Sequence, residues 1–205
     1  MMNFKHPIEE VIAPHYEKFK SIEGYFFADD SALNFFRTRP ANTDSNDVLL
    51  KIDEIRDHDL IQLEAQDIMV EHILSLKIDP KLADGDTAIV NRIALLKNYR
   101  GKDRNLYAFA TRYCNYHRPD YYPIYDRLLE KMLSWFYLRI EGKKFDHSQL
   151  FDYTTFKGFM DHFVSNFSLP PLNYFELDKF LWTYGRKVIE DFERLNELHP
   201  KRKNK

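Results

Sequence analysis

The spacing of the apolar residues is the feature that most constrains how this chain can fold. From Val48 to Ile78 the apolar residues recur every three or four positions and do not alternate with polar ones. That period places them on one face of a helix, whereas a half-buried strand would alternate. The stretch 104–116 repeats the helical pattern through Leu106, Phe109, Ala110, Tyr113 and Cys114. No stretch offers several short alternating strands, so we predict an all-α fold, a multi-helix orthogonal bundle of about seven to nine helices.

Prolines and polar stretches divide this pattern into segments. Pro14 has no amide hydrogen and is expected to kink or end a helix within the first twenty residues. The polar stretch RPANTDSND ends at residue 47 and separates an expected N-terminal helical arm, 1–47, from a helical core domain, 48–195. The basic residues 196–205 are expected to form a mobile tail. We expect helices over 32–39, 87–99, 104–116, 127–140, 154–167 and 173–195, and loops over 78–86 and 141–150.

The composition narrows the class of protein. Hydrophobic residues make up 44% of the chain, which argues against disorder as the overall state. The net charge of −2 gives no global attraction to nucleic acid or anionic lipid, so such binding would need a local basic patch. The single cysteine, Cys114, excludes an intramolecular disulfide and fits a reducing compartment. No signal peptide and no run of about 18 apolar residues is present, so we expect a cytoplasmic protein without a membrane partner.

Metal and cofactor signatures are missing from the sequence. The eight histidines include no H-E-x-x-H pair and no carboxylate partner at metal-binding spacing. The chain contains neither a glycine-rich phosphate loop nor the G-x-S-x-G turn of a serine nucleophile. Cys114 lies on the apolar face of its predicted helix, which favours core packing over nucleophilic chemistry. We therefore predict no metal and no cofactor.

The stretch RNLYAFATRYCNYHRPDYYPIYD, residues 104–126, concentrates the residues that can carry chemistry. Asp126 precedes a predicted helix, so its carboxylate is expected to accept hydrogen bonds from the first turn. The same carboxylate is a candidate catalytic base or charge stabiliser if it faces a cleft. The two roles are compatible.

An R-x4-H pattern, Arg112 and His117, lies on the helix before that loop. Five positions along a helix are about one and a third turns, so we expect the two side chains close to the same side. An arginine holds phosphate and a histidine exchanges a proton with a ribose 2′-hydroxyl, as in a ribonuclease. The alternative is that Arg112 pairs with a nearby acid and that His117 caps the end of the helix.

The tyrosines of this stretch have two possible roles. Beside Arg112 and Arg118 they could stack on bases, and Tyr122 is one such candidate. Core packing, with the hydroxyl reaching water or a carbonyl, is the more common use of such rings and is the role we favour.

The segment FATRYCNYHRPDYYPIYD and the later FELDKFLWTYGRK resemble bacterial proteins, largely of unassigned function, with a fold similar to helix-hairpin-helix DNA glycosylases. The resemblance implies a helix-hairpin-helix glycosylase-like core over about 87–187. It also implies that Asp126 stabilises positive charge at the sugar carbon and that Lys102 lies in the hairpin. The hairpin motif L-P-G-x-G is replaced here by NYRGKDR, with only one glycine. Arg112 stands where the family segment has lysine and cannot form a Schiff base, which argues against lyase chemistry.

Three functional hypotheses follow. The first is a nucleic-acid-associated protein, binding DNA or alternatively RNA without lyase activity, with Asp126 at its site. The second is an R-x4-H ribonuclease of a toxin or defence system, with His117 catalytic. The third is a non-enzymatic protein-interaction module with an exposed apolar patch near Tyr121 and Tyr122. In the first hypothesis the nucleic-acid contacts are Lys102, Arg104, Arg112, Arg118, Tyr122 and Lys187.

Overall fold

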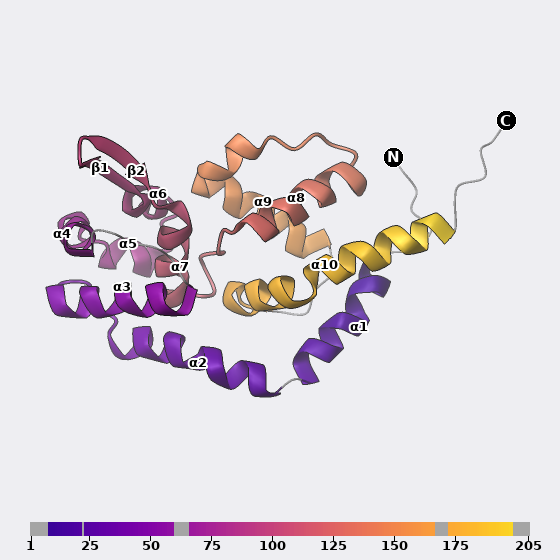
Figure 1. The fold of residues 1–205 in the computed structure, drawn as a ribbon, viewed down its shortest axis with the longest axis horizontal. Coiled ribbons are helices and arrows are strands. Elements are labelled where there is room, and N and C mark those ends of the chain that lie inside the picture. The colour runs from indigo at the N-terminus through magenta and orange to yellow at the C-terminus, as the bar shows by residue number, and fades with distance from the viewer. Residues whose placement is uncertain (1–7, 22, 60–65, 167–171, 199–205) are drawn as a thin grey trace.

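The helical period of the sequence produces ten α-helices, one 3-10 helix and one β-hairpin in the computed structural model, which describes residues 8–21, 23–59, 66–166 and 172–198 (Figure 1). The all-α prediction is confirmed, with more helices than expected. The elements are α1 (Ile8–Ser21), α2 (Glu23–Thr38), α3 (Ser45–Asp59), α4 (Gln66–Leu76), α5 (Asp79–Asp84), α6 (Ala88–Ala94), β1 (Leu95–Tyr99), β2 (Lys102–Asn105), α7 (Tyr107–His117), α8 (Arg127–Arg139), η1 (His147–Phe151), α9 (Tyr153–Asn166) and α10 (Tyr174–Leu198).

Helix α7 lies at the centre of the bundle. Eight of its eleven residues are buried, and it packs against α2, α3, α6 and α10. Phe36 of α2 meets the rings of Tyr113 and Tyr116 edge-on, with centroids 5.6 and 5.4 Å away. Edge-to-face ring pairs add a directional attraction to the area that they bury. The aromatic stretch is therefore core, as the apolar pattern predicted.

The two ends of the chain pack together through α1 and α10 (Figure 1). The His15 Nε2 donates a hydrogen bond of 2.8 Å to the carboxylate of Asp191, and the rings of Phe19 and Phe180 lie 5.6 Å apart. Of the two expected effects of Pro14, a kink or an end of the helix, the end does not occur, since α1 continues to Ser21. The buried face of α1 against α10 supplies the stability that the missing amide hydrogen bond removes.

The apolar period predicted one helix over 87–99, and this prediction is wrong. Helix α6 ends at Ala94, and Leu95 begins an antiparallel hairpin. The reversal uses left-handed backbone at Asn98, Arg100 and Gly101, with φ of 54°, 50° and 79°. Asparagine and glycine tolerate that region better than most residues, which favours the turn over a continued helix. A hydrogen bond of 2.8 Å from the amide of Leu106 to the carbonyl of Ala94 closes the base of the hairpin.

Other boundaries differ in smaller ways. Helix α5 forms within the predicted loop 78–86, and η1 forms within 141–150. Helix α2 begins well before residue 32, and α7 begins at Tyr107, three residues later than expected. Helices α8, α9 and α10 confirm the three predicted C-terminal helices. Residues 199–205 of the predicted tail lie outside the described residues.

The predicted division near residue 47 stays a prediction. The N-terminal helices contribute buried side chains, including Phe19 and Phe36, to the same core cluster as the later helices. Within the described part of the chain, none of the helices combines the length and the apolar character that a bilayer span requires.

At Gly85 both the left-handed backbone and the neighbouring Tyr121 ring disfavour any residue with a Cβ atom. It ends α5 with a φ of 71°, and an ideal Cβ there would lie 2.6 Å from Cδ1 of Tyr121. Gly101 has a similar φ of 79°, but no described atom lies within 4 Å of an added Cβ.

We predict that Gly85→Ala lowers the free energy of unfolding more than Gly101→Ala does. Each substitution costs about 1–2 kcal/mol for the left-handed backbone, and only Gly85→Ala adds the clash with the Tyr121 ring. Urea unfolding of both variants measures the difference. Equal losses would show that the ring moves aside without cost.

Candidate functional site

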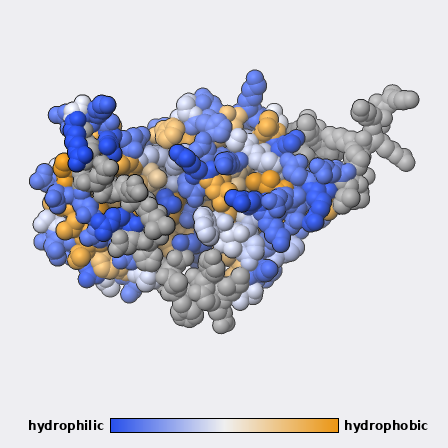
Figure 2. Space-filling view, in the orientation of Figure 1, coloured by the Kyte–Doolittle hydropathy of each residue, from blue (hydrophilic) through white to orange (hydrophobic). Residues whose placement is uncertain are grey.

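The β-hairpin of residues 95–105 carries four basic residues and one acidic residue, and we call it the basic hairpin. Lys97, Arg100, Lys102 and Arg104 are all exposed on it. Asp103 is its single acid, and its carboxylate accepts the amide hydrogen of Asn98 at 2.9 Å. Figure 2 shows hydrophilic residues gathered over the hairpin. The sequence of the hairpin therefore concentrates positive charge on a projection held by α6 and α7.

A groove of about 680 Å³ lies beside the basic hairpin. One wall is α4, and the other is formed by the end of α6 and the start of β1. The imidazole Nε2 of His72 lies 3.0 Å from the carbonyl oxygen of Arg92 and joins the two walls. The lining residues are Ile68, Glu71, His72, Ser75, Leu76, Arg92, Leu95, Leu96 and Lys97.

The predicted nucleic-acid contacts do not form one cluster. Lys102 and Arg104 lie on the basic hairpin, which precedes α7, whereas Arg118 follows the other end of α7. Arg118 donates to the carbonyl oxygen of Ala83 at 2.9 Å. Lys187 is exposed on α10.

The loop tyrosines divide into one exposed ring and one buried ring. Tyr121 is 41% exposed, with the Arg118 guanidinium 4.3 Å from its ring centroid. Tyr122 is fully buried, and its hydroxyl lies 3.4 Å from the carbonyl oxygens of Lys81 and Asp86. The expected pairing of Tyr121 and Tyr122 in one exposed patch is therefore wrong, and Tyr122 cannot stack on a base without leaving the core.

Asp126 is the N-cap of α8, as predicted. Its carboxylate accepts the amide hydrogen of Leu129 at 2.7 Å, and the side chain is half-buried. Glu130, in the same first turn of α8, accepts hydrogen bonds from the Tyr125 hydroxyl at 2.5 Å and from the His147 ring nitrogen at 2.7 Å. The hydrogen bond from Leu129 gives Asp126 a structural role at the start of α8.

Arg112 and His117 contact different neighbours and do not converge. Arg112 Nη1 lies 3.4 Å from the carbonyl oxygen of Tyr125, whereas His117 Nε2 lies 3.2 Å from Oδ1 of Asn42. Five residues correspond to about 140° around a helix axis, which accounts for the divergence. Burial, and then the nearby Lys51 ammonium, lower the pKa of His117 to about 3. The imidazole is therefore neutral near pH 7 and a weak base.

Asn42 forms the centre of a buried polar cluster that the sequence did not reveal. Its Oδ1 accepts hydrogen bonds from Lys51 Nζ at 2.9 Å, from the Tyr113 hydroxyl at 2.5 Å and from His117. Its amide nitrogen donates to Asp79 at 2.6 Å. We call these five residues the Asn42 cluster. A charged residue on the apolar face of α3, Lys51 beside Ile52, Ile55 and Val48, was the one sequence signal for it.

Lys51 is the most unusual member of the Asn42 cluster. The side chain is fully buried, and its ammonium also donates to the carbonyl oxygen of Ala41 at 2.6 Å. Burial lowers its pKa to about 8, and the negative charge of Asp79 opposes that shift. A buried ammonium is tolerated only when such partners replace water.

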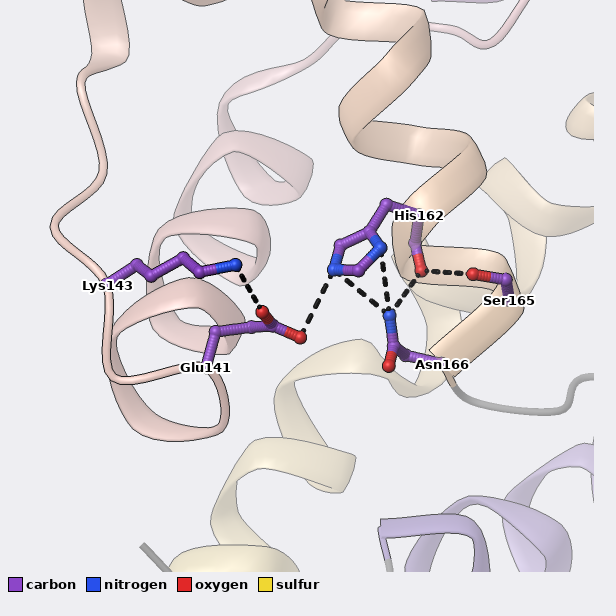
Figure 3. A network of polar contacts seen from close by, with 5 residues as sticks. All are labelled: Glu141, Lys143, His162, Ser165 and Asn166. Atoms are coloured by element: carbon purple, nitrogen blue, oxygen red, sulfur yellow. Dashed lines mark hydrogen bonds and ion pairs between the residues drawn. The ribbon is translucent and has the colours of Figure 1, made fainter. Parts of the chain in front are cut away.

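A second polar network joins the end of α8 to α9 (Figure 3). Glu141 accepts from Lys143 at 2.8 Å and from the His162 ring at 3.1 Å. Ser165 donates to the backbone carbonyl of His162 at 2.8 Å and not to its ring, so the serine is not activated by the histidine. The network fixes the helix ends and supplies no nucleophile.

The cysteine thiol and possible metal ligands remain to be placed. Cys114 is a free, fully buried thiol, and burial raises its pKa well above the usual value, which confirms its packing role. Among the residues that the structure describes, no group of three or more His, Cys, Asp or Glu side chains is arranged to hold a metal ion.

The architecture defines an all-α bundle with a basic hairpin between two of its helices. The chain belongs to the HI_0787_N family, whose model is described as an N-terminal domain and matches residues 8–121. An uncharacterised protein of Haemophilus influenzae is 33% identical over 122 residues, which are 59% of this chain and 57% of that relative. The match thus spans little more than half of the relative's length. No solved structure matches the chain.

We predict that Asn42→Ala lowers the free energy of unfolding by about 3 kcal/mol, because it leaves the buried Lys51 ammonium and Asp79 carboxylate with fewer partners. Chemical unfolding measures the loss. The matched control is Asn46→Ala at an exposed position of α3, with an expected change within about 0.5 kcal/mol. Equal stabilities of the two variants would contradict the central role of Asn42.

We also predict that His117 makes the fold sensitive to acid. Its folded-state pKa of about 3 lies below the ordinary value of 6.5, so the unfolded chain binds the proton first as the pH falls. Stability therefore falls between pH 6.5 and 3, by at most about 1.4 kcal/mol per pH unit from this group. His117→Gln should reduce the slope of unfolding free energy against pH. Parallel slopes for both proteins would contradict the assignment.

Proposed function

We propose that this protein binds nucleic acid through the basic hairpin and does not cleave the glycosidic bond. The observation that carries the proposal is the exposure of four cations and one acid within residues 95–105 of a chain whose net charge is −2. Such a patch attracts phosphates locally, whereas the molecule as a whole does not.

Binding without lyase chemistry fits the contacts around the other candidate residues. Arg112 hydrogen-bonds the backbone and remains protonated, so it is not a Schiff-base nucleophile. Asp126 is engaged as a helix cap. Lys102 stands on the exposed hairpin, where an ammonium serves as a phosphate contact.

We predict salt-dependent binding of fluorescently labelled DNA or RNA in anisotropy titrations. Four phosphate contacts give a slope of about −3 in the logarithm of affinity against the logarithm of salt concentration. The double variant Lys102→Glu with Arg104→Glu should weaken binding at least about tenfold and flatten the slope, because it reverses two of the four contacts. Single-stranded DNA, duplex DNA with an abasic site and RNA together reveal the preferred partner.

The matched control reverses the same amount of charge elsewhere, with Lys18→Glu on α1 and Lys144→Glu after α8. Both side chains are exposed, and α1 lies at the end of the molecule away from the hairpin (Figure 1). The control should bind as the unaltered protein does. Equal weakening in both double variants would mean that net charge, and not the hairpin, determines binding. No binding to any of the three at low salt would overturn the proposal.

A further inference from the structure

We infer that the groove between α4 and β1 holds one unpaired nucleotide of the bound strand, with a preference for a base that carries an exocyclic amino group. The inference rests on the proposed function, because the basic hairpin must first bind the strand. It adds the kind of nucleic acid, single-stranded over duplex, and the part of the strand that is recognised.

The groove has the size and the apolar surface that a nucleobase requires. Its volume of about 680 Å³ falls within the usual range of small-ligand sites. Ile68 and Leu95 line it and remain 43% and 39% exposed, with the buried Leu96 beside them. A flat base that covers these side chains removes apolar surface from water, and every base has such a face. A paired base in a duplex has both of its faces stacked on neighbouring bases, so neither face can cover these side chains.

The charges on the β1 side suit the phosphate of the same nucleotide. Arg92 and Lys97 both line this wall and are exposed. Lys97 belongs to the basic hairpin as well as to the groove, so the positive surface continues from the hairpin into the groove without interruption. A strand whose backbone follows the hairpin therefore brings its next phosphate to Arg92 and Lys97.

The α4 wall presents acceptors to the base. Glu71 and Ser75 lie one helical turn apart, and both line the groove. His72 directs Nε2 at the carbonyl oxygen of Arg92, 3.0 Å away, so Nδ1 is the ring nitrogen left for the base. A carboxylate repels phosphate but accepts hydrogen bonds from the amino groups of adenine, cytosine and guanine. Thymine and uracil offer carbonyl oxygens at the equivalent position, which Glu71 disfavours.

Two substitutions separate the apolar contact from the polar one. Ile68→Asp should weaken the binding of single-stranded oligodeoxycytidine by about tenfold. It should leave duplex binding unchanged, since duplex contacts use the hairpin alone. Ile68→Val is the conservative control and should bind as the unaltered protein does. Glu71→Gln should remove the preference of the unaltered protein for oligodeoxycytidine over oligodeoxythymidine of equal length, expected at about tenfold.

Anisotropy titrations of the 205-residue chain with the two oligonucleotides and a duplex test the inference. Tighter single-strand binding that Ile68→Asp selectively removes, together with a cytosine preference that Glu71→Gln removes, supports it. Equal affinity for all three nucleic acids, unchanged by either substitution but lost in the Lys102→Glu, Arg104→Glu variant, overturns the groove and leaves the hairpin as the binding element. Absence of binding by the unaltered protein overturns the groove and the proposed function together.

Discussion

The Asn42 amide is the contact on which the arrangement of α3, α5 and α7 depends. One side chain from the loop between α2 and α3 hydrogen-bonds Lys51 of α3, Asp79 of α5, and Tyr113 and His117 of α7. Two of these partners carry opposite charges, and a charge in the interior is stable only while it is paired or hydrogen-bonded. The cluster therefore fixes how α2, α3 and α5 lie around α7, with an angular precision that apolar packing alone does not impose.

The position of α7 in turn determines where the basic hairpin lies. The hairpin is held at its base by the hydrogen bond between Leu106 and Ala94, immediately before α7, while its turn projects into solvent. A fixed base with a charged, exposed tip suits the proposed recognition of a phosphate backbone, because such a surface needs little ordering on binding. The polar cluster inside the bundle and the charged surface outside it are thus connected through one helix.

The amphipathic period predicted the long helices because a buried stripe is visible in the sequence, as in α8, α9 and α10. The period gave a wrong prediction where the same apolar residues fit either a helix or a strand. Leu95 and Leu96 continue the helical period of α6, yet the left-handed residues from Asn98 to Gly101 turn them into a strand. Asn42 could not be predicted as a core residue, because it lies in a polar stretch and the sequence does not distinguish a buried loop asparagine from an exposed one. The R-x4-H spacing places the two side chains about 140° apart around the helix, and each has its own partner, Arg112 at Tyr125 and His117 at Asn42.

The basic hairpin, the groove and the Asn42 cluster all lie within residues 8–121, the part of the chain that defines its family. Asp126 and Lys187 lie beyond it: Asp126 caps α8, which packs against α9 and α10, and Lys187 lies on α10, which also packs against α1 and α7. The proposed phosphate and base contacts therefore all fall within the family segment, which α10 covers at α1 and α7 and α9 covers at α6. Since Asp126 caps α8 while the charge and the groove lie on the hairpin side, the proposed binding surface is separate from the residue that the glycosylase-like resemblance suggested for chemistry.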